Sequence, residues 1–207
     1  CISHFFDIIV ENANNIGCVN CEYIDNLGIN LNTNLNTFIN LNLHTNNAIT
    51  LLNITGTYNH FINCRLIGNE EATGVIISKW SNVFDDCEIR AFNKSVEVDD
   101  QANFTVFNNC VITGNDNSSS YTVHITGGDD VVFNSCDIEK GVNNIYVTGG
   151  QCQFSNTYFE GASGSYSIVL NGGNTVFTSN YFSNSRIAKY QDNKLTLLNN
   201  IVRIAIL

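Results

Sequence analysis

A short pattern of apolar and polar residues recurs along nearly the whole chain. Each unit begins with an apolar residue, continues with two mostly polar residues and ends on a Cys or another small or apolar residue. The clear copies are Phe38–Leu41, Phe61–Cys64, Phe84–Cys87, Phe107–Cys110, Phe133–Cys136, Phe154–Thr157 and Phe177–Asn180. Cys18–Cys21 fits at the start, and Leu198–Ile201 fits more loosely near the end. The step between copies is 20 to 26 residues throughout, which indicates a repeat architecture.

Positions beside each unit also keep their character. Two residues after the unit comes an apolar residue, and only Arg203 breaks this series: Tyr23, Leu43, Leu66, Ile89, Ile112, Ile138, Phe159 and Phe182. One residue before the end of the unit comes a small polar residue: Asn20, Asn40, Asn63, Asp86, Asn109, Ser135, Asn156, Ser179 and Asn200. We expect this polar column to form an asparagine ladder at a turn, because Asn tolerates left-handed backbone angles and its amide can bond the next amide in a stack.

A second strand precedes most units, and its period-two alternation predicts one inward face. The inward pairs are Val75 and Ile77, Val96 and Val98, Val123 and Ile125, Ile145 and Val147, and Ile168 and Leu170. Gly-Gly turns often follow, and the repeat contains no amphipathic helix. The pattern therefore predicts an all-β fold, a single-stranded right-handed parallel β-helix of about nine coils with roughly 23 residues per coil, formed by residues 1–207 as one domain. The Phe, Cys and Ile columns are expected to be internal.

Composition narrows the classes of function. Only 14% of the residues are charged and 43% are hydrophobic, which excludes ordinary disorder. The net charge of -10 argues against a nucleic-acid partner. No long apolar run is present, so we expect no membrane insertion. The sequence contains no Met, and we expect it to be a fragment or processed form of a longer chain. Residues 201–207 leave the repeat, and we expect them to cap the open end or to contact another subunit.

The 8 cysteines follow the repeat rather than a disulfide scaffold. Cys64, Cys87, Cys110 and Cys136 form one inward column, and we expect free thiols there, as in a protein that folds in a cytosol. Cys18 and Cys21 have the spacing of half a zinc site or of a redox pair, but they occupy repeat positions and are expected to be structural. We predict no metal site and no cofactor.

The repeat and its Asn column resemble the pectin-lyase-like right-handed parallel β-helix superfamily over essentially the whole chain. Members include lyases, hydrolases, phage tailspikes and bacterial adhesins, so the resemblance specifies fold rather than function. The chain most resembles a phage tailspike or tail-fibre segment. That resemblance implies a homotrimer in the virion tail, folded in the host cytoplasm, that binds a cell-surface polysaccharide. The alternatives are a polysaccharide-cleaving hydrolase or lyase, and a secreted adhesin or passenger domain at the cell surface; whether the protein is an enzyme stays open.

The outward positions of the second strand carry the predicted ligand site. Stacking of successive coils brings together Glu97, Asp99, His124, Thr126, Tyr146 and Thr148. Carboxylates can bond sugar hydroxyls and aromatic rings can stack on apolar sugar faces, so these residues are the candidates for a polysaccharide groove, and a plain solvated sheet face is the alternative. We expect the other outward columns to be less mixed in chemistry.

Two carboxylate pairs are candidates for glycoside hydrolysis. Glu97 with Asp99 and Asp137 with Glu139 stand two residues apart on one strand face, about 6.6 Å by strand rise. Hydrolysis needs carboxylates roughly 5–9.5 Å apart, so the spacing is permissive. Glu139 and Glu160 are expected on adjacent coils. Asp99–Asp100 and Asp129–Asp130 could hold Ca²⁺, but solvation of turns explains them more simply, which weakens the lyase alternative.

Overall fold

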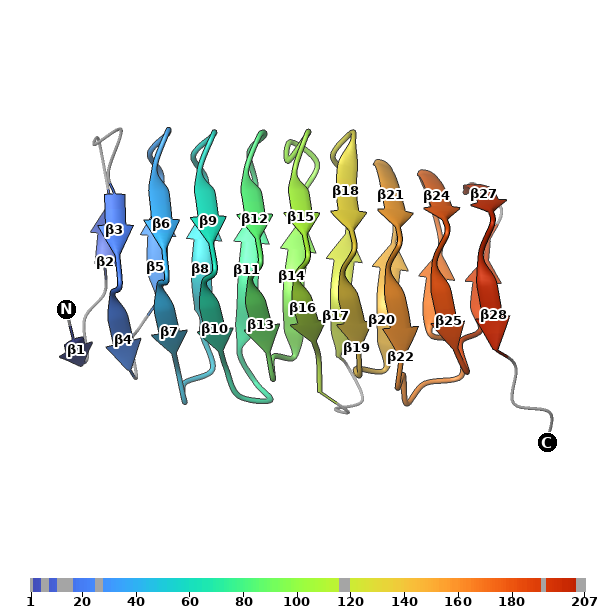
Figure 1. Ribbon diagram of the computed structural model, residues 1–207, viewed down its shortest axis with the longest axis horizontal. Coiled ribbons are helices and arrows are strands. Elements are labelled where there is room, and N and C mark those ends of the chain that lie inside the picture. Colours follow the sequence, from blue (N-terminus) through green and yellow to red (C-terminus); the bar gives the residue numbers. More distant parts are fainter. Residues whose placement is uncertain are drawn as a thin grey trace.

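The computed structural model describes residues 2–4, 8–10, 17–24, 28–115, 120–190 and 193–203. This part of the chain forms a rod of stacked coils in which three parallel sheets run along the long axis (Figure 1). Every coil contributes one short strand to each sheet in turn, and each strand pairs in parallel with its equivalents in the neighbouring coils, which is the arrangement that the repeat predicts. The all-β fold class is therefore confirmed.

Within the described residues, the three sheets, named A, B and C, hold ten, nine and nine strands. Sheet A consists of β1 (Ile2–His4), β4 (Glu22–Ile24), β7 (Asn42–His44), β10 (Arg65–Ile67), β13 (Glu88–Arg90), β16 (Val111–Thr113), β19 (Asp137–Glu139), β22 (Tyr158–Glu160), β25 (Tyr181–Ser183) and β28 (Ile201–Arg203). Sheet B consists of β2 (Ile8–Val10), β5 (Ile29–Leu31), β8 (Thr50–Ile54), β11 (Thr73–Ile77), β14 (Lys94–Val98), β17 (Tyr121–Ile125), β20 (Asn143–Val147), β23 (Ile168–Leu170) and β26 (Ile187–Lys189). Sheet C consists of β3 (Gly17–Val19), β6 (Thr37–Ile39), β9 (His60–Ile62), β12 (Val83–Asp85), β15 (Val106–Asn108), β18 (Val131–Asn134), β21 (Gln151–Ser155), β24 (Asn174–Thr178) and β27 (Lys194–Leu198).

The coils wind in a right-handed sense. In Figure 1 the strands of sheets C and A run downward on the near side, the strands of sheet B run upward on the far side, and successive coils advance from left to right. This is the hand that right-twisted parallel strands favour in crossover connections.

A column of stacked phenylalanines forms the centre of the core. Phe38, Phe61, Phe84, Phe107, Phe133, Phe154 and Phe177 follow one another with ring centroids 4.7–5.0 Å apart and ring planes within 14° of parallel. All are buried. Cys18 and Leu197 hold the same register in the terminal coils. The Phe column thus spans seven coils. The sequence predicts about nine coils because it also counts the terminal units at Cys18 and Leu198, which begin with residues other than Phe.

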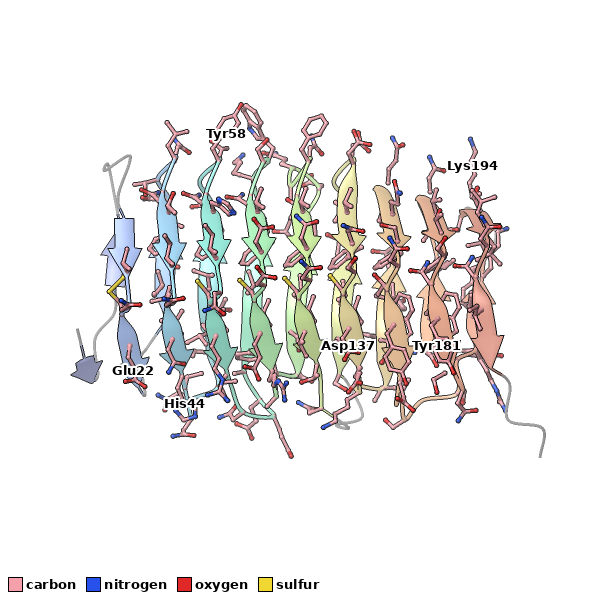
Figure 2. All side chains as sticks on the ribbon, in the orientation of Figure 1. Glu22, His44, Tyr58, Asp137, Tyr181 and Lys194 are labelled. Carbon is pink, nitrogen blue, oxygen red and sulfur yellow. A yellow bond between two sulfur atoms is a disulfide. The ribbon has the colours of Figure 1, made fainter. Side chains whose placement is uncertain are left out.

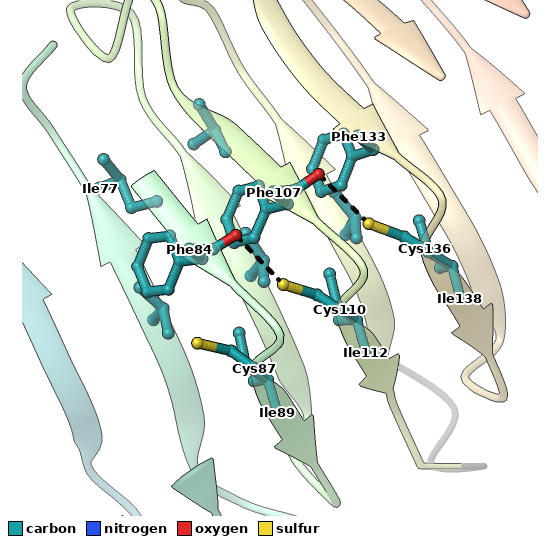
Figure 3. Packing of buried hydrophobic residues seen from close by; sticks show 14 of the residues in the cluster. Ile77, Phe84, Cys87, Ile89, Phe107, Cys110, Ile112, Phe133, Cys136 and Ile138 are labelled. Carbon is teal, nitrogen blue, oxygen red and sulfur yellow. Dashed lines mark hydrogen bonds between the residues drawn. The ribbon is translucent and has the colours of Figure 1, made fainter. Parts of the chain in front are cut away.

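The Cys column lies beside the Phe column and confirms the prediction of free, buried thiols at Cys64, Cys87, Cys110 and Cys136. Each Sγ lies 3.4–3.5 Å from the carbonyl oxygen of the Phe one coil earlier (Figure 3). Thr157, Asn180 and Asn200 continue the column and donate to the equivalent Phe carbonyls. The column is therefore a row of hydrogen-bond donors as well as a row of small side chains.

Cys18 and Cys21 form a disulfide in the N-terminal coil. They occupy the register positions of Phe38 and Leu41, as the repeat predicts, but the bond between them was not predicted. Among the clear repeat units such a bond is possible only in this coil, because the next seven units begin with Phe and not with Cys.

The predicted polar column occupies the corner between sheets C and A. Its residues have positive φ angles of 50–56° from Asn20 to Ser179, and Asn40 and Asn63 each donate from Nδ2 to the Oδ1 of the preceding Asn at 2.7 Å. A second ladder, which the sequence analysis missed, is fully buried where the chain enters sheet C. There Asn36 donates to Asn59 at 2.7 Å and Asn59 donates to Asn82 at 3.0 Å.

The last coil corrects the sequence alignment by one residue. Leu197 pairs with Phe177 and Val202 pairs with Phe182, while Asn199 has the positive φ of the corner. The unit is therefore 197–200, and Arg203 does not interrupt the apolar series. Of the proposed cap, residues 201–203 form β28 and residues 204–207 lie outside the described residues.

Candidate functional site

The predicted ligand residues stand together on the outer side of sheet B. Glu97 on β14, His124 on β17 and Tyr146 on β20 are in register on successive coils. Asp99, Thr126 and Thr148 follow the ends of the same strands. We call these six residues the sheet B patch. Their coming together follows from the alternation of side chains along a strand, which turns Val96 and Val98 inward and Glu97 outward.

Glu97 lies between the side chains of Lys94 and His124. Its Oε2 lies 3.1 Å from Nζ of Lys94, and its Oε1 lies 3.3 Å from Nδ1 of His124, a contact that is electrostatic because the ring N–H is poorly aligned. The His124 ring, followed by Lys94, lowers the pKa of Glu97 against the opposing effect of burial. The Glu97 and His124 side chains are only 18% and 14% exposed, so the contact between them is less screened by solvent and salt than a contact on the open surface.

The His124 ring belongs to a cluster of three rings beside Glu97. Tyr121 and Tyr146 stack with centroids 4.7 Å apart, and the His124 ring lies 5.4 and 5.3 Å from them. Tyr121 was missed in the sequence analysis, although it begins the strand that carries His124 and is in register with Lys94. The rings offer an apolar surface beside a fixed carboxylate, which is the combination that binds the faces and hydroxyls of sugars.

The remaining polar groups of the patch already have internal partners. Ser78 Oγ donates to Asp99 at 2.6 Å, and the hydroxyls of Thr126 and Thr148 donate to carbonyls of the preceding coil at 3.2 and 3.4 Å. These bonds fix the side chains and leave their oxygens as acceptors. The lowered pKa of Glu97 suits a general base or nucleophile rather than a general acid, so in a hydrolytic pair with Asp99 the acid would have to be Asp99.

The outer side of sheet A holds a second group of polar residues. Asp137 and Glu139 lie on β19, and Glu139 is in register with Glu160 on β22, as expected. Burial first, and then the charges of Glu139 and Glu160, raise the pKa of Asp137 to about 6, against the opposing charge of Arg90. Asp137 Oδ1 is buried without a hydrogen-bond partner. We call Asp137, Glu139 and Glu160 the sheet A carboxylates.

Tyrosines and a serine border these carboxylates. The hydroxyl of Tyr158 donates to Glu160, and Ser183 Oγ donates to the other oxygen of Glu160 at 3.2 Å. Tyr158 and Tyr181 stack at 5.3 Å, and Figure 2 shows Asp137 and Tyr181 on the same lower part of the rod. The expectation that the other outward columns are less mixed in chemistry is therefore wrong. The signal was present, since these residues flank the apolar position that follows each Phe unit.

The acidic turns have partners within the protein. Ser78 bonds Asp99, and Gln151 Nε2 donates to Asp129 Oδ1 at 3.2 Å. Across the residues that the structure describes, no three His, Cys, Asp or Glu side chains gather as a metal site would require. Within the same part of the chain there is no helix of the length and hydropathy needed to span a bilayer.

The fold defines the class of the protein as a parallel β-helix, or β-solenoid. Neither a protein-family model nor a curated protein sequence matches the chain. Function therefore has to be argued from the surface of the rod.

Proposed function

We propose that the protein binds a carbohydrate polymer through the sheet B patch. The observation that carries this proposal is the shielded contact of Glu97 with His124 beside the stacked rings of Tyr121 and Tyr146. A rigid carboxylate beside ring faces suits a sugar chain, whose residues present hydroxyl edges and apolar faces. The net charge of -10 disfavours a polyanion such as nucleic acid.

Among proteins of this architecture, we propose that the chain is a phage tailspike or tail-fibre segment of the pectin-lyase-like superfamily. Such a segment would act as a homotrimer in the virion tail and would bind a polysaccharide of the host surface. The free thiols of the Cys column support folding in a reducing cytoplasm. Native mass spectrometry tests the assembly: a mass of three chains supports the tailspike proposal, and a monomer contradicts it.

Binding to a panel of bacterial surface polysaccharides, measured by calorimetry, tests the patch. Tyr146→Ala removes a ring of the cluster and Asp99→Asn removes a charge-assisted hydrogen-bond acceptor. We expect each to weaken binding about tenfold, equal to ~1.4 kcal/mol. Tyr181→Ala, which removes a tyrosine from sheet A, is the matched control. Equal binding by the parent, Tyr146→Ala and Asp99→Asn would refute the placement of the site.

A second candidate function is hydrolysis of the polymer at the sheet A carboxylates. The observation that favours it is the pKa of Asp137, raised to about 6 beside Glu139 and Glu160. A protonated Asp137 could act as general acid while a neighbouring carboxylate acts as base or nucleophile. New reducing ends in the panel, lost on Asp137→Asn and on Glu139→Gln but kept in Glu71→Gln, a change at an exposed turn outside both sites, would support hydrolysis. Unchanged cleavage by Asp137→Asn would exclude this site.

A secreted adhesin is favoured by one different observation, the disulfide between Cys18 and Cys21. Disulfides persist in oxidising compartments rather than in the cytosol. Peptide mass mapping of protein purified under non-reducing conditions checks whether the bond is retained. A stable bond in a monomeric protein would favour the adhesin over the trimeric tailspike.

A further inference from the structure

A line of large apolar side chains is exposed along the corner where sheet B leads into sheet C. Leu35, Tyr58, Trp80 and Phe104 come from four successive coils and are 52%, 48%, 42% and 55% exposed. Figure 2 shows Tyr58 at this upper edge of the rod. We call these four residues the corner ridge. The next coil has Asp130 at the equivalent corner, so the ridge ends there.

The backbone at this corner disfavours the side chains that it carries. Leu35, Tyr58 and Phe104 have φ angles of 60°, 56° and 54°, in the left-handed region that is unusual for bulky residues. The corner between sheets C and A has the same conformation but holds small polar residues such as Asn40 and Asn63. The coil geometry is therefore compatible with Asn, and it does not account for Leu, Tyr and Phe at the corner ridge.

Packing within the chain does not account for them either. About half of each side chain remains open to solvent, and the one ring contact among them is the edge-on contact of Tyr58 with Trp80 at 4.8 Å. Strained residues that are neither buried nor required by the turn are characteristic of functional surfaces. Among the described residues no packing covers the corner ridge, which makes it a candidate contact surface.

The shape of the corner ridge identifies the kind of partner. A fully covered aromatic side chain buries about 150–250 Å², so four half-exposed side chains offer roughly 400 Å², about half of the ~800 Å² per partner of a standard protein interface. The ridge is one residue wide per coil, and polar groups such as Thr57 and the Lys79–Gln101 pair border it. A linear polymer with apolar faces and hydroxyl edges fits this single line better than a protein surface does.

We propose that the corner ridge is a second carbohydrate-contact surface, on which a polysaccharide lies along the rod axis with its sugar rings stacked on Tyr58, Trp80 and Phe104. The inference rests on the proposed function and extends it to a new surface. Phe104 follows β14 in the same coil as Asp99, so the corner ridge begins where the sheet B patch ends. A polymer can therefore contact both. Single-stranded nucleic acid also stacks on rings, but it needs a positively charged groove.

Trp80 allows binding at the corner ridge to be measured directly by fluorescence, because the sequence contains a single tryptophan. The full chain would be titrated with maltohexaose, cellohexaose and chitohexaose, following Trp80 emission and its quenching by acrylamide, with calorimetry in parallel. We expect at least one of these probes to shift the emission and to protect Trp80 from the quencher. Binding by none of them in either measurement would overturn both the corner ridge and the proposed function.

Replacement by Asn separates binding from folding. Tyr58→Asn with Phe104→Asn places a residue suited to positive φ at both corners, so we expect the melting temperature to stay the same or rise while affinity falls at least tenfold. Ser81→Asn, at the equivalent position of the Trp80 coil, is the matched control and should bind like the parent. Binding that is lost on Tyr146→Ala but unchanged in the Asn pair, without a Trp80 signal, would overturn the corner ridge and leave the sheet B patch intact.

Self-association tests the competing occupant, a second copy of this chain. Sedimentation velocity over a range of concentrations would show whether Trp80→Ala changes the assembly state. An assembly unchanged by Trp80→Ala agrees with a carbohydrate partner. An assembly that dissociates in Trp80→Ala would make the corner ridge a subunit interface and overturn the proposal.

Discussion

The inner and outer sides of the same strands follow different rules. On β14, β17 and β20 the inward positions are Val96, Val123 and Ile145, whereas the outward positions in register are Glu97, His124 and Tyr146. An inward side chain is covered by its equivalents in the coils above and below, so its size and polarity are constrained. An outward side chain also lies between its equivalents in two coils, but its outer side faces solvent, so the residue type can change from coil to coil. The inward residues are therefore determined by the packing of the fold, whereas the outward residues can vary and can carry binding groups.

The largest difference between the two sides is expected on β15. Phe107 is fully buried in the middle of the Phe column, while its strand neighbour Val106 points outward. Phe107→Ala should lower the free energy of unfolding by about 3–5 kcal/mol through the lost ring and the cavity it leaves. Val106→Ala, the matched control, should lower it by under about 1 kcal/mol. Urea unfolding followed by circular dichroism measures both, and similar values for the two would remove the distinction.

The two asparagine ladders extend the comparison to polar side chains. Asn59 is buried and its Oδ1 accepts from both the backbone and the side chain of Asn36, whereas Asn40 lies in the exposed ladder. Asn59→Ala leaves buried donors unpaired and should lower the free energy of unfolding by about 1–3 kcal/mol. Asn40→Gly should have a smaller effect, because glycine accepts the positive φ and water can replace the lost bond. An equal loss in the two variants would contradict this account.

The outer faces of sheets A and B should differ in the sign of their pH dependence. Asp137 has a pKa raised from 3.8 to about 6, so its contribution stabilises the protein below pH 3.8 and is lost as the pH rises through about 6. Asp137→Asn should flatten the stability profile in that window. Glu97 has a lowered pKa, so its contribution is present at neutral pH and is lost as the pH falls below its ordinary value of 4.5.

Thermal unfolding between pH 3 and 8 measures these two contributions. Glu97→Gln should remove stability at neutral pH and should not change the profile around pH 6. A loss of stability in Asp137→Asn at pH 7 would contradict the raised pKa, because the variant removes a carboxylate that is disfavoured in the folded state.

Chemical accessibility gives the smallest but most direct contrast. Cys64, Cys87, Cys110 and Cys136 are buried, so iodoacetamide should label them only after denaturation. Cys18 and Cys21 should stay unlabelled in both states unless a reductant is added. Peptide mass mapping distinguishes the two groups. Labelling of the column in the native protein, or bridges such as Cys64–Cys87, would show that the interior is not closed.

The same contrast explains what the sequence could predict. The Phe column and the inward pairs of sheet B were predictable because one chemical type returns at a nearly constant step. The last coil was misaligned because 197–200 reads Leu-Leu-Asn-Asn, so that two registers fit the pattern equally well. The buried ladder of Asn36, Asn59 and Asn82 was missed because it lies among turn residues whose direction no periodicity specifies.

The candidate site was predictable only in its placement on the sheet. Alternation placed Glu97, His124 and Tyr146 on one face. It could not show that Lys94 pairs with Glu97 on the same strand or that Arg90 opposes the raised pKa of Asp137, because both effects depend on side-chain conformations and on distances that alternation does not specify. The corner ridge could not be predicted either, because it is recognised by the positive φ of bulky exposed residues, and the sequence does not show a backbone angle.

The regular step of the Phe column has an evolutionary consequence. Phe38, Phe61, Phe84 and Phe107 are 23 residues apart, and each ring stacks on the next at 4.7–5.0 Å. A segment that begins at one Phe and ends before the next carries one complete coil with the same upper and lower surfaces. In-frame duplication or deletion of such a segment joins surfaces that already match, so recombination can change the copy number without a new kind of contact. The length of the rod would then change in steps of one coil.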